Sequence, residues 1–208
     1  MVAEQIAARG ISDARVLEAM RTVPRHEFVE DADRAAAYRD TPLGIGYHQT
    51  ISQPFIVALM TALVRPAATD RALEIGTGSG YQPAVLSRVV AQVYSMELIP
   101  ELADAARARL ARLGYTNVIM RQGDGYLGWP DAAPFDIIIV TAAPEQIPPT
   151  LLEQLRPGGR LIVPVGPVGA VQDLVLLEKD DAGTVTKRTV APVRFVPMVS
   201  ASATAAVP

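Results

Sequence analysis

The segment Gly76-Thr77-Gly78-Ser79-Gly80 is the clearest chemical signature in the sequence. Glycines let the backbone approach a ligand closely, and this segment joins an apolar stretch to a helical one. The spacing is G-x-G-x-G, whereas dinucleotide-binding proteins use G-x-G-x-x-G. Glu74 stands just before the first glycine, where it would repel a pyrophosphate but suit a ligand with sulfonium and ammonium groups. The pattern predicts a site for S-adenosylmethionine; a tight turn without a ligand is the alternative.

Two more acidic residues follow apolar stretches further along the chain. Glu97 comes roughly 20 residues after the glycines, where it could accept hydrogen bonds from both ribose hydroxyls. Asp124, between two glycines, could accept from an adenine amino group. Each has an ordinary alternative, a solvated carboxylate for Glu97 and an Asx turn for Asp124. Because ligands of open α/β sheets bind at the carboxyl ends of the strands, acids at successive strand ends favour a common ligand.

These residues must be positioned by the elements around them, which alternate between strands and helices after Asp70. We expect strands over 71–75, 93–96, 118–121, 135–140 and 161–163, and helices over 81–90, 100–113 and 148–155. The helix over 148–155 is expected to close at residues 156–159. Such alternation predicts a Rossmann-like methyltransferase fold with a mostly parallel, doubly wound sheet. Two apolar segments, 174–178 and 185–190, flank a polar turn and predict that the sheet ends in antiparallel strands.

The first third of the chain predicts a helical N-terminal extension. Ser12 or Asp13 can cap a helix that ends before Pro24, and a short helix is expected over 32–37. Ser52 can cap a third helix, which has Pro54 in its first turn. We expect a single domain over 1–200, made of a helical part (1–69) and a Rossmann-like core (70–200), followed by a flexible tail over 201–208.

Composition restricts the classes of function. The chain has 208 residues, a net charge of −3 and no basic cluster, which argues against a nucleic-acid partner. It has no cysteine and only two histidines, so no metal site is expected. The N-terminus does not resemble a signal peptide, and the most apolar stretch, 161–171, is too short to span a bilayer. We expect a cytoplasmic monomer without a membrane partner.

Residues 37–54, AYRDTPLGIGYHQTISQP, resemble the segment that marks protein-L-isoaspartate O-methyltransferases. The stretches 23–29, 73–82, 141–144 and 155–161 are similar to that family as well. The resemblance runs from about Ile6 to Met198. The element Thr50-Ile51-Ser52-Gln53-Pro54 is specific to the family, whereas the glycine turn is shared with many methyltransferases. Gly44, where bacterial members often have proline, and His48, where a small residue is common, depart from the pattern.

The resemblance implies transfer of the methyl group of S-adenosylmethionine to the free α-carboxylate of L-isoaspartyl residues in damaged proteins and peptides. The ester would then collapse to a succinimide, which hydrolyses partly to aspartate. Ser52 corresponds to the active-site residue, and Gln53 and the backbone of Val196 would help to hold the substrate. The implied cofactor contacts are Gln49, Thr50, Ile51, Glu74, Gly76, Gly78, Glu97, Asp124 and Gly125.

A serine suffices for this chemistry because the nucleophile is a carboxylate. Its reference pKa is about 3.5, so it is ionised at neutral pH without a general base. What remains is to orient it for in-line attack and to exclude water. Ser52 could serve both as a helix cap and as this orienting donor. His48 could be a surface imidazole or a substrate contact.

Two other functions are compatible with parts of the sequence. A related methyltransferase could modify aspartate in a dedicated peptide, using the same cofactor. A non-catalytic nucleotide-binding module would need the glycine turn but not the element over 50–54.

Overall fold

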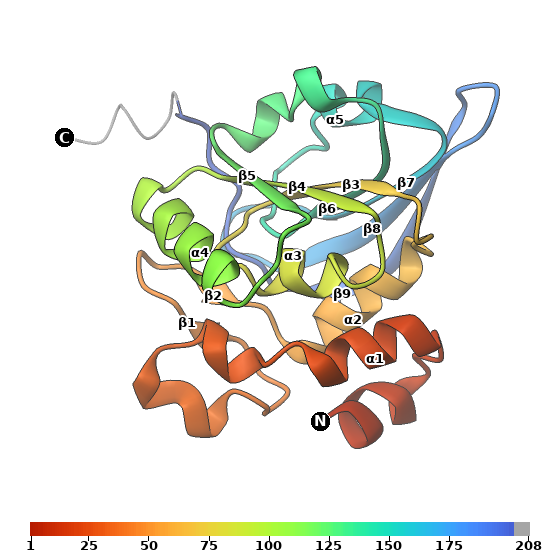
Figure 1. Ribbon diagram of the computed structural model, residues 1–208. Coiled ribbons are helices and arrows are strands. Elements are labelled where there is room, and N and C mark those ends of the chain that lie inside the picture. Colours follow the sequence, from red (N-terminus) through yellow and green to blue (C-terminus); the bar gives the residue numbers. More distant parts are fainter. Residues whose placement is uncertain (202–208) are drawn as a thin grey trace.

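The structure is a computed structural model that describes residues 1–201. A seven-stranded sheet runs through it in the order β5-β4-β3-β6-β7-β8-β9 (Figure 1). Its strands are β3 (Arg71–Ile75), β4 (Gln92–Glu97), β5 (Val118–Gln122), β6 (Phe135–Val140), β7 (Leu155–Val165), β8 (Gln172–Lys179) and β9 (Val185–Val193). Strands β3 to β7 pair in parallel, whereas β8 and β9 are antiparallel. The predicted mostly parallel sheet with an antiparallel end is therefore confirmed.

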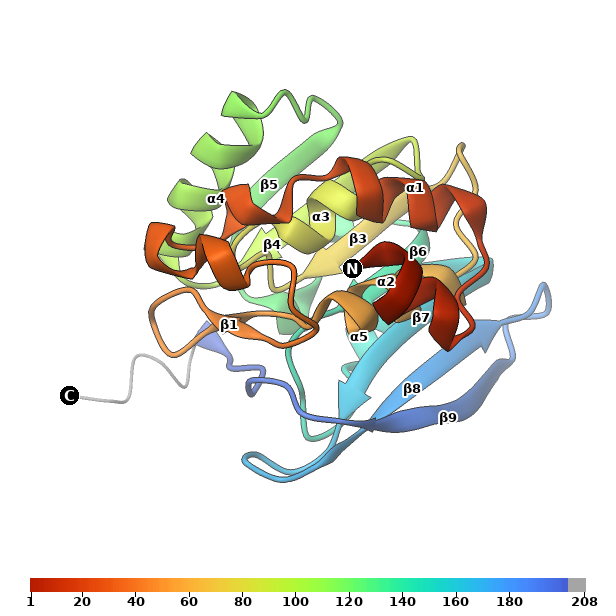
Figure 2. The ribbon, with the colours of Figure 1, turned by 90° about the horizontal axis from the view of Figure 1, so that it is seen from below.

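Helices cover both faces of this sheet. The α-helices are α1 (Ala14–Thr22), α2 (Pro54–Leu63), α3 (Tyr81–Leu86), α4 (Pro100–Arg112) and α5 (Pro149–Glu153). Short 3₁₀ helices cover Ala7–Arg9, Arg25–Phe28, Asp31–Ala36, Gly125–Leu127 and Pro130–Ala132, and a π-helical turn covers Val2–Ile6. Figure 1 shows α5 on one side of the sheet and α1 to α4 on the other, and Figure 2 shows α1, α2 and α3 across that second face.

The central strand β6 shows why the sheet needs helices on both faces. Its side chains alternate between the two faces, as the pleat of a strand requires. Ile137 and Ile139 pack into the cluster that includes the apolar residues of α1 to α4, whereas Ile138 and Val140 pack into the cluster on the α5 side. All four are fully buried, so the predicted buried strand is confirmed.

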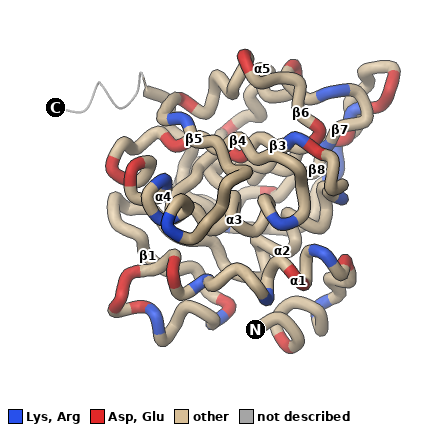
Figure 3. The backbone as a smooth tube through the Cα atoms, viewed as in Figure 1, with Lys and Arg blue, Asp and Glu red and all other residues tan. Residues whose placement is uncertain are grey.

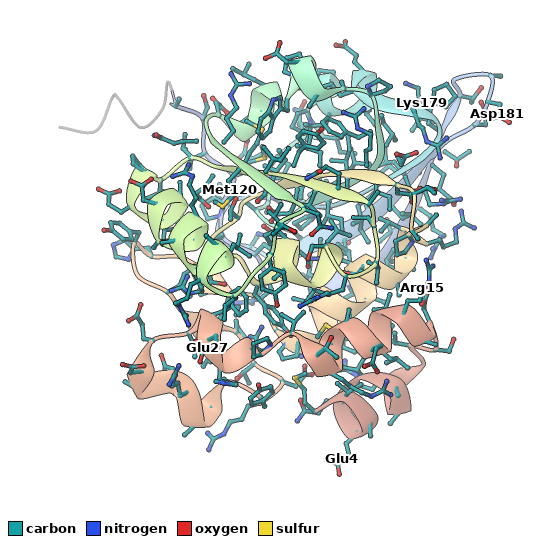
Figure 4. The ribbon with its side chains drawn as sticks, viewed as in Figure 1. Glu4, Arg15, Glu27, Met120, Lys179 and Asp181 are labelled. Carbon is teal, nitrogen blue, oxygen red and sulfur yellow. The ribbon has the colours of Figure 1, made fainter. Side chains whose placement is uncertain are left out.

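The N-terminal part packs on the core and is not wholly helical. Asp13 caps α1, accepting from the backbone N–H groups of Arg15 and Val16 at 2.9 and 3.2 Å, as expected. A small antiparallel pair, β1 (Leu43–Gly44) and β2 (Thr50–Ile51), leads to α2. Glu27, labelled in Figure 4, pairs with Arg112 of α4 at 2.9 Å, and this hydrogen bond lowers the pKa of Glu27.

Two predicted boundaries are wrong. Helix α3 ends at Leu86 rather than Val90, because residues 87–89 form turns before the chain enters β4. The segment 156–159, expected to close a helix, lies within β7. It bulges there, since Leu155 pairs with Phe135 while Arg160 pairs with Ile137. Of the predicted tail over 201–208, residues 202–208 lie outside the described residues.

Basic and acidic residues are interspersed along the backbone, as Figure 3 shows. Among residues 1–201, no three acidic or histidine side chains are grouped so that they could hold a metal ion. None of the described helices is long and apolar enough to cross a membrane.

Candidate active site

A cavity lies at the carboxyl ends of β3, β4 and β6. We call it the first cavity. Its wall includes the ends of β3 and β4, the loop after β5 and the loop after β6, where an open α/β sheet binds ligands. The predicted residues on its wall are Gln49, Thr50, Ile51, Ser52, Gly76, Gly78, Glu97, Gly125 and Val196.

The glycine turn forms one side of the first cavity. Gly76, Gly78 and Gly80 have φ values of 96°, 51° and 90°, in the left-handed region that favours glycine. A Cβ atom on Gly76 would lie 2.5 Å from Oγ1 of Thr141. The same hydroxyl donates to the Gly76 carbonyl at 2.7 Å. The turn therefore requires a glycine at position 76 both for its conformation and for its contact with the loop after β6.

Glu97, at the end of β4, lies on the wall of the first cavity with its carboxylate held by two backbone groups. Its Oε2 accepts from Gly78 N–H at 2.7 Å, and its Oε1 accepts from Ile99 N–H at 3.0 Å. Each carboxylate oxygen has two acceptor positions, so each retains one for a ligand. This fixed pair of acceptors suits two neighbouring hydroxyl groups, as the sequence predicts.

Glu74 is placed behind the cavity wall rather than on it. It is fully buried, its carboxyl accepts from Ser95 Oγ at 2.6 Å, and Thr141 Oγ1 lies 3.4 Å away from it. Burial raises the pKa of Glu74 from 4.5 to about 8, and the nearby Glu97 adds to the rise. The residue therefore supports the glycine turn from inside, and its predicted direct contact with a ligand stays a prediction.

Asp124 forms the Asx turn that the sequence left open. Its Oδ1 accepts from Tyr126 N–H at 2.9 Å, and its Oδ2 accepts from Ala201 N–H at 2.9 Å. The side chain does not line the first cavity, so its contact with a base stays a prediction. Gly125 does line it, and a Cβ atom there would overlap Ile75.

A second cavity adjoins the first. The two share Thr50, Ser52 and Thr141 on their walls. Gln53, predicted to contact the substrate, lines the second cavity only. Apart from Arg194, the described residues of the second wall are uncharged. Two ligands, one in each cavity, could therefore come into contact beside Ser52.

Ser52 occupies the junction between β2 and α2. The expectation that it caps α2 is wrong: the N-cap is Gln53, because Pro54 fixes the first helical position one residue later. Within the described part of the chain the Ser52 hydroxyl has no hydrogen-bond partner. It is thus free to donate to a ligand in either cavity.

Of the two remaining predicted residues, one lines a cavity and the other does not. Val196 lies on the first wall, and its carbonyl accepts from Ala143 N–H at 2.8 Å. His48 is exposed, with a φ of 56°, and lines neither cavity, which matches the surface alternative. Sequence reasoning missed Thr141, although its place directly after a buried parallel strand puts it at the ligand-binding edge.

Comparison with known proteins identifies the family. The model of the protein-L-isoaspartate(D-aspartate) O-methyltransferase family matches residues 1–203. A relative from Syntrophobacter fumaroxidans, named protein-L-isoaspartate O-methyltransferase 2, is 58% identical over 186 residues, covering 89% of this chain and 75% of its own. A protein-L-isoaspartate O-methyltransferase from Gloeobacter violaceus is 53% identical, covering 95% of this chain and 96% of its own.

Solved structures agree. A protein-L-isoaspartate O-methyltransferase superposes with a TM-score of 0.85 at 33% identity; the match covers 95% of this chain but only 65% of that longer one. A Plasmodium falciparum protein assigned to the same methyltransferases, solved with S-adenosyl-L-homocysteine, has a TM-score of 0.81 at 24% identity. The first structure is similar to this chain in sequence and in fold, whereas the second is evidence for the fold alone. The chain belongs to the protein-L-isoaspartate(D-aspartate) O-methyltransferase family.

Proposed function

We propose that this chain transfers the methyl group of S-adenosylmethionine to the free α-carboxylate of L-isoaspartyl residues in damaged proteins, the first step of their repair. Family membership supports the reaction. The observation that carries the proposal is the junction of two cavities at Ser52, with the glycine turn in one wall and an uncharged surface around most of the other.

The first cavity fits the methyl donor. Gly76 and Gly78 allow close approach of the backbone, and Glu97 offers one free acceptor position on each carboxylate oxygen for the ribose hydroxyls. Residues 49–51 would cover the ligand from the opposite side. When bound, S-adenosylmethionine supplies an electrophilic methyl group to this cavity.

The second cavity would take the peptide that carries the acceptor. An α-carboxylate is ionised at neutral pH, so the protein need only orient it and keep water away. The free hydroxyl of Ser52 can donate one hydrogen bond to one carboxylate oxygen and leave the other oxygen to react. A neutral donor suits this role, because a cation would hold the carboxylate more tightly and weaken its attack.

One chain supplies both cavities and Ser52, so we expect a monomer to be active. We also expect it to act in the cytoplasm, where damaged intracellular proteins would be its substrates. The related function, methylation of aspartate in a dedicated peptide, uses the same cavities and differs only in the acceptor.

Paired peptides separate these functions. The chain is incubated with S-adenosylmethionine labelled in the methyl group and with two peptides that differ only in an L-isoaspartyl or an L-aspartyl linkage. We expect base-labile label in the isoaspartyl peptide alone. Label in the aspartyl peptide would favour the related function, and label in neither, despite binding of the cofactor, would contradict the proposal.

A further inference from the structure

Asp40 lines neither cavity but is the centre of a hydrogen-bond cluster next to Ser52. Its Oδ1 accepts from the backbone N–H of Phe55 at 2.9 Å. Its Oδ2 accepts from the Gln53 side-chain amide at 2.6 Å and from the Arg9 guanidinium at 2.7 Å. One carboxylate thus holds both the side chain that follows Ser52 and the first turn of α2.

The cluster replaces the missing cap of α2. Gln53, the N-cap, makes no side-chain cap bond, and Pro54 has no N–H. Phe55 therefore carries the first backbone N–H of the helix, which has no partner within the helix. Asp40 satisfies it from 15 residues earlier in the chain. Arg9 completes the cluster, with its guanidinium carbon 3.4 Å from the centre of the Phe55 ring.

Ser52 is held on its other side by the small strand pair. Thr50 pairs with Gly44, and Ile51 pairs with Leu43. Ser52 follows directly and is in turn followed by Gln53, which Asp40 holds. The position of the Ser52 hydroxyl is therefore set by backbone constraints from both sides, while the hydroxyl itself stays free within the described part of the chain.

We infer that Asp40 is a positioning residue for methyl transfer, which fixes Gln53 and the first turn of α2 so that Ser52 presents its hydroxyl where the two cavities meet. The inference rests on the function proposed above. It predicts that loss of the Asp40 carboxylate slows the reaction through Ser52 alone and leaves the first cavity able to bind its ligand.

Asp40→Ala tests this with three measurements: the thermal midpoint, the affinity for S-adenosyl-L-homocysteine by calorimetry, and kcat and KM with an isoaspartyl peptide. Misplacement of an orienting group by about 1 Å can cost about 100-fold, so we expect kcat to fall by 10- to 100-fold. The affinity for S-adenosyl-L-homocysteine should stay within about 2-fold. Asp40→Asn retains an acceptor for Phe55 N–H but turns an amide NH2 group towards the Gln53 and Arg9 donors, so that it keeps one of the three hydrogen bonds and should give a smaller loss of kcat than Asp40→Ala.

Asp13→Ala is the matched control. Asp13 also caps a helix through its carboxylate, accepting from Arg15 and Val16 N–H. It precedes α1, where Arg15 donates to the carbonyl of Pro66, beyond the end of α2 that is opposite Ser52. Its loss should lower the thermal midpoint comparably and leave kcat unchanged. If Asp13→Ala lowers kcat as much as Asp40→Ala does, the effect of Asp40 is one of general stability and the inference is wrong.

The double variant Asp40→Ala/Ser52→Ala separates the inference from the proposed function. If Asp40 acts through Ser52, the double variant has the kcat of Ser52→Ala within about 2-fold. Losses that multiply would overturn the inference and leave the role of Ser52 intact. Unchanged kcat in Ser52→Ala would overturn the proposed role of Ser52 itself. Should Asp40→Ala fail to fold, Asp40→Asn enters the same comparison.

Discussion

Substitution of Gly76 by alanine tests the geometry of the cavity wall most sharply. An alanine at a φ of 96° is strained by about 1–2 kcal/mol. Its Cβ atom would also lie 2.5 Å from Thr141 Oγ1, and overpacking of this kind typically costs a further 1–3 kcal/mol, about as much again. Because the turn must shift away from Thr141, the affinity for S-adenosyl-L-homocysteine should fall at least about 10-fold, or 1.4 kcal/mol.

Gly10 provides a matched control for this substitution. Its φ is 95°, but nothing lies within 4 Å of a Cβ atom built on it. Gly10→Ala should therefore show the conformational strain alone. Urea denaturation measures the free energy of unfolding of each variant, and calorimetry measures its affinity for S-adenosyl-L-homocysteine. We expect Gly76→Ala to be the less stable of the two and the only one with weakened affinity.

Removal of the clashing atom gives a second check. Thr141→Ala eliminates Oγ1, and the next atoms around the new Cβ lie at 3.7 and 3.8 Å, which is ordinary contact. Gly76→Ala should therefore cost less stability in the Thr141→Ala background than in the wild type. Equal stability and equal affinity of the two glycine variants would refute this reasoning. So would an equal stability cost of Gly76→Ala in the Thr141→Ala background and in the wild type, because the close approach of the turn to Thr141 would then have no energetic consequence.

Three further substitutions have distinct outcomes. Ser52→Ala should sharply lower kcat with nearly unchanged cofactor affinity; unchanged turnover would exclude the positioning role. Because the pKa of Glu74 is raised, the folded chain keeps a proton that the unfolded chain loses above pH 4.5. The free energy of unfolding therefore falls as the pH rises from 4.5 to about 8. Glu74→Gln should flatten that fall in urea denaturation, and an unaltered slope would contradict it. Arg194 is exposed on the second wall without a partner in the described chain. Arg194→Glu should shift kcat/KM from acidic towards basic flanking residues by up to about 5-fold, and no shift would exclude this contact.

The sheet could be predicted because its signals are local. The run Ile137-Ile138-Ile139-Val140 is strongly β-forming and apolar on both faces, and the structure buries it completely. The glycine turn was likewise predictable, because its residues with positive φ are the ones that favour glycine. The lengths of the helices were less predictable. Helix α3 ends early because the following turns return the chain to the sheet, which local periodicity does not encode.

In the candidate site, too, local features were predictable and contacts between distant segments were not. Glu97 is the last residue of β4, and its place on the cavity wall was predictable from the position of the strand end. The cap of α2 was not, because the acceptor is Asp40, far from Phe55 in the sequence, and the local Ser52-Gln53-Pro54 pattern pointed to Ser52 instead. Contacts between distant segments, such as Thr141 with Gly76, become visible only once the sheet brings their strands together.

A crystal structure of the complex with S-adenosyl-L-homocysteine and an isoaspartyl peptide tests the central claim most directly. The account predicts S-adenosyl-L-homocysteine in the first cavity, the peptide in the second, and one α-carboxylate oxygen at about 2.7 Å from Ser52 Oγ, a normal hydrogen-bond distance. A peptide carboxylate bound away from Ser52, or a peptide outside the second cavity, would contradict it.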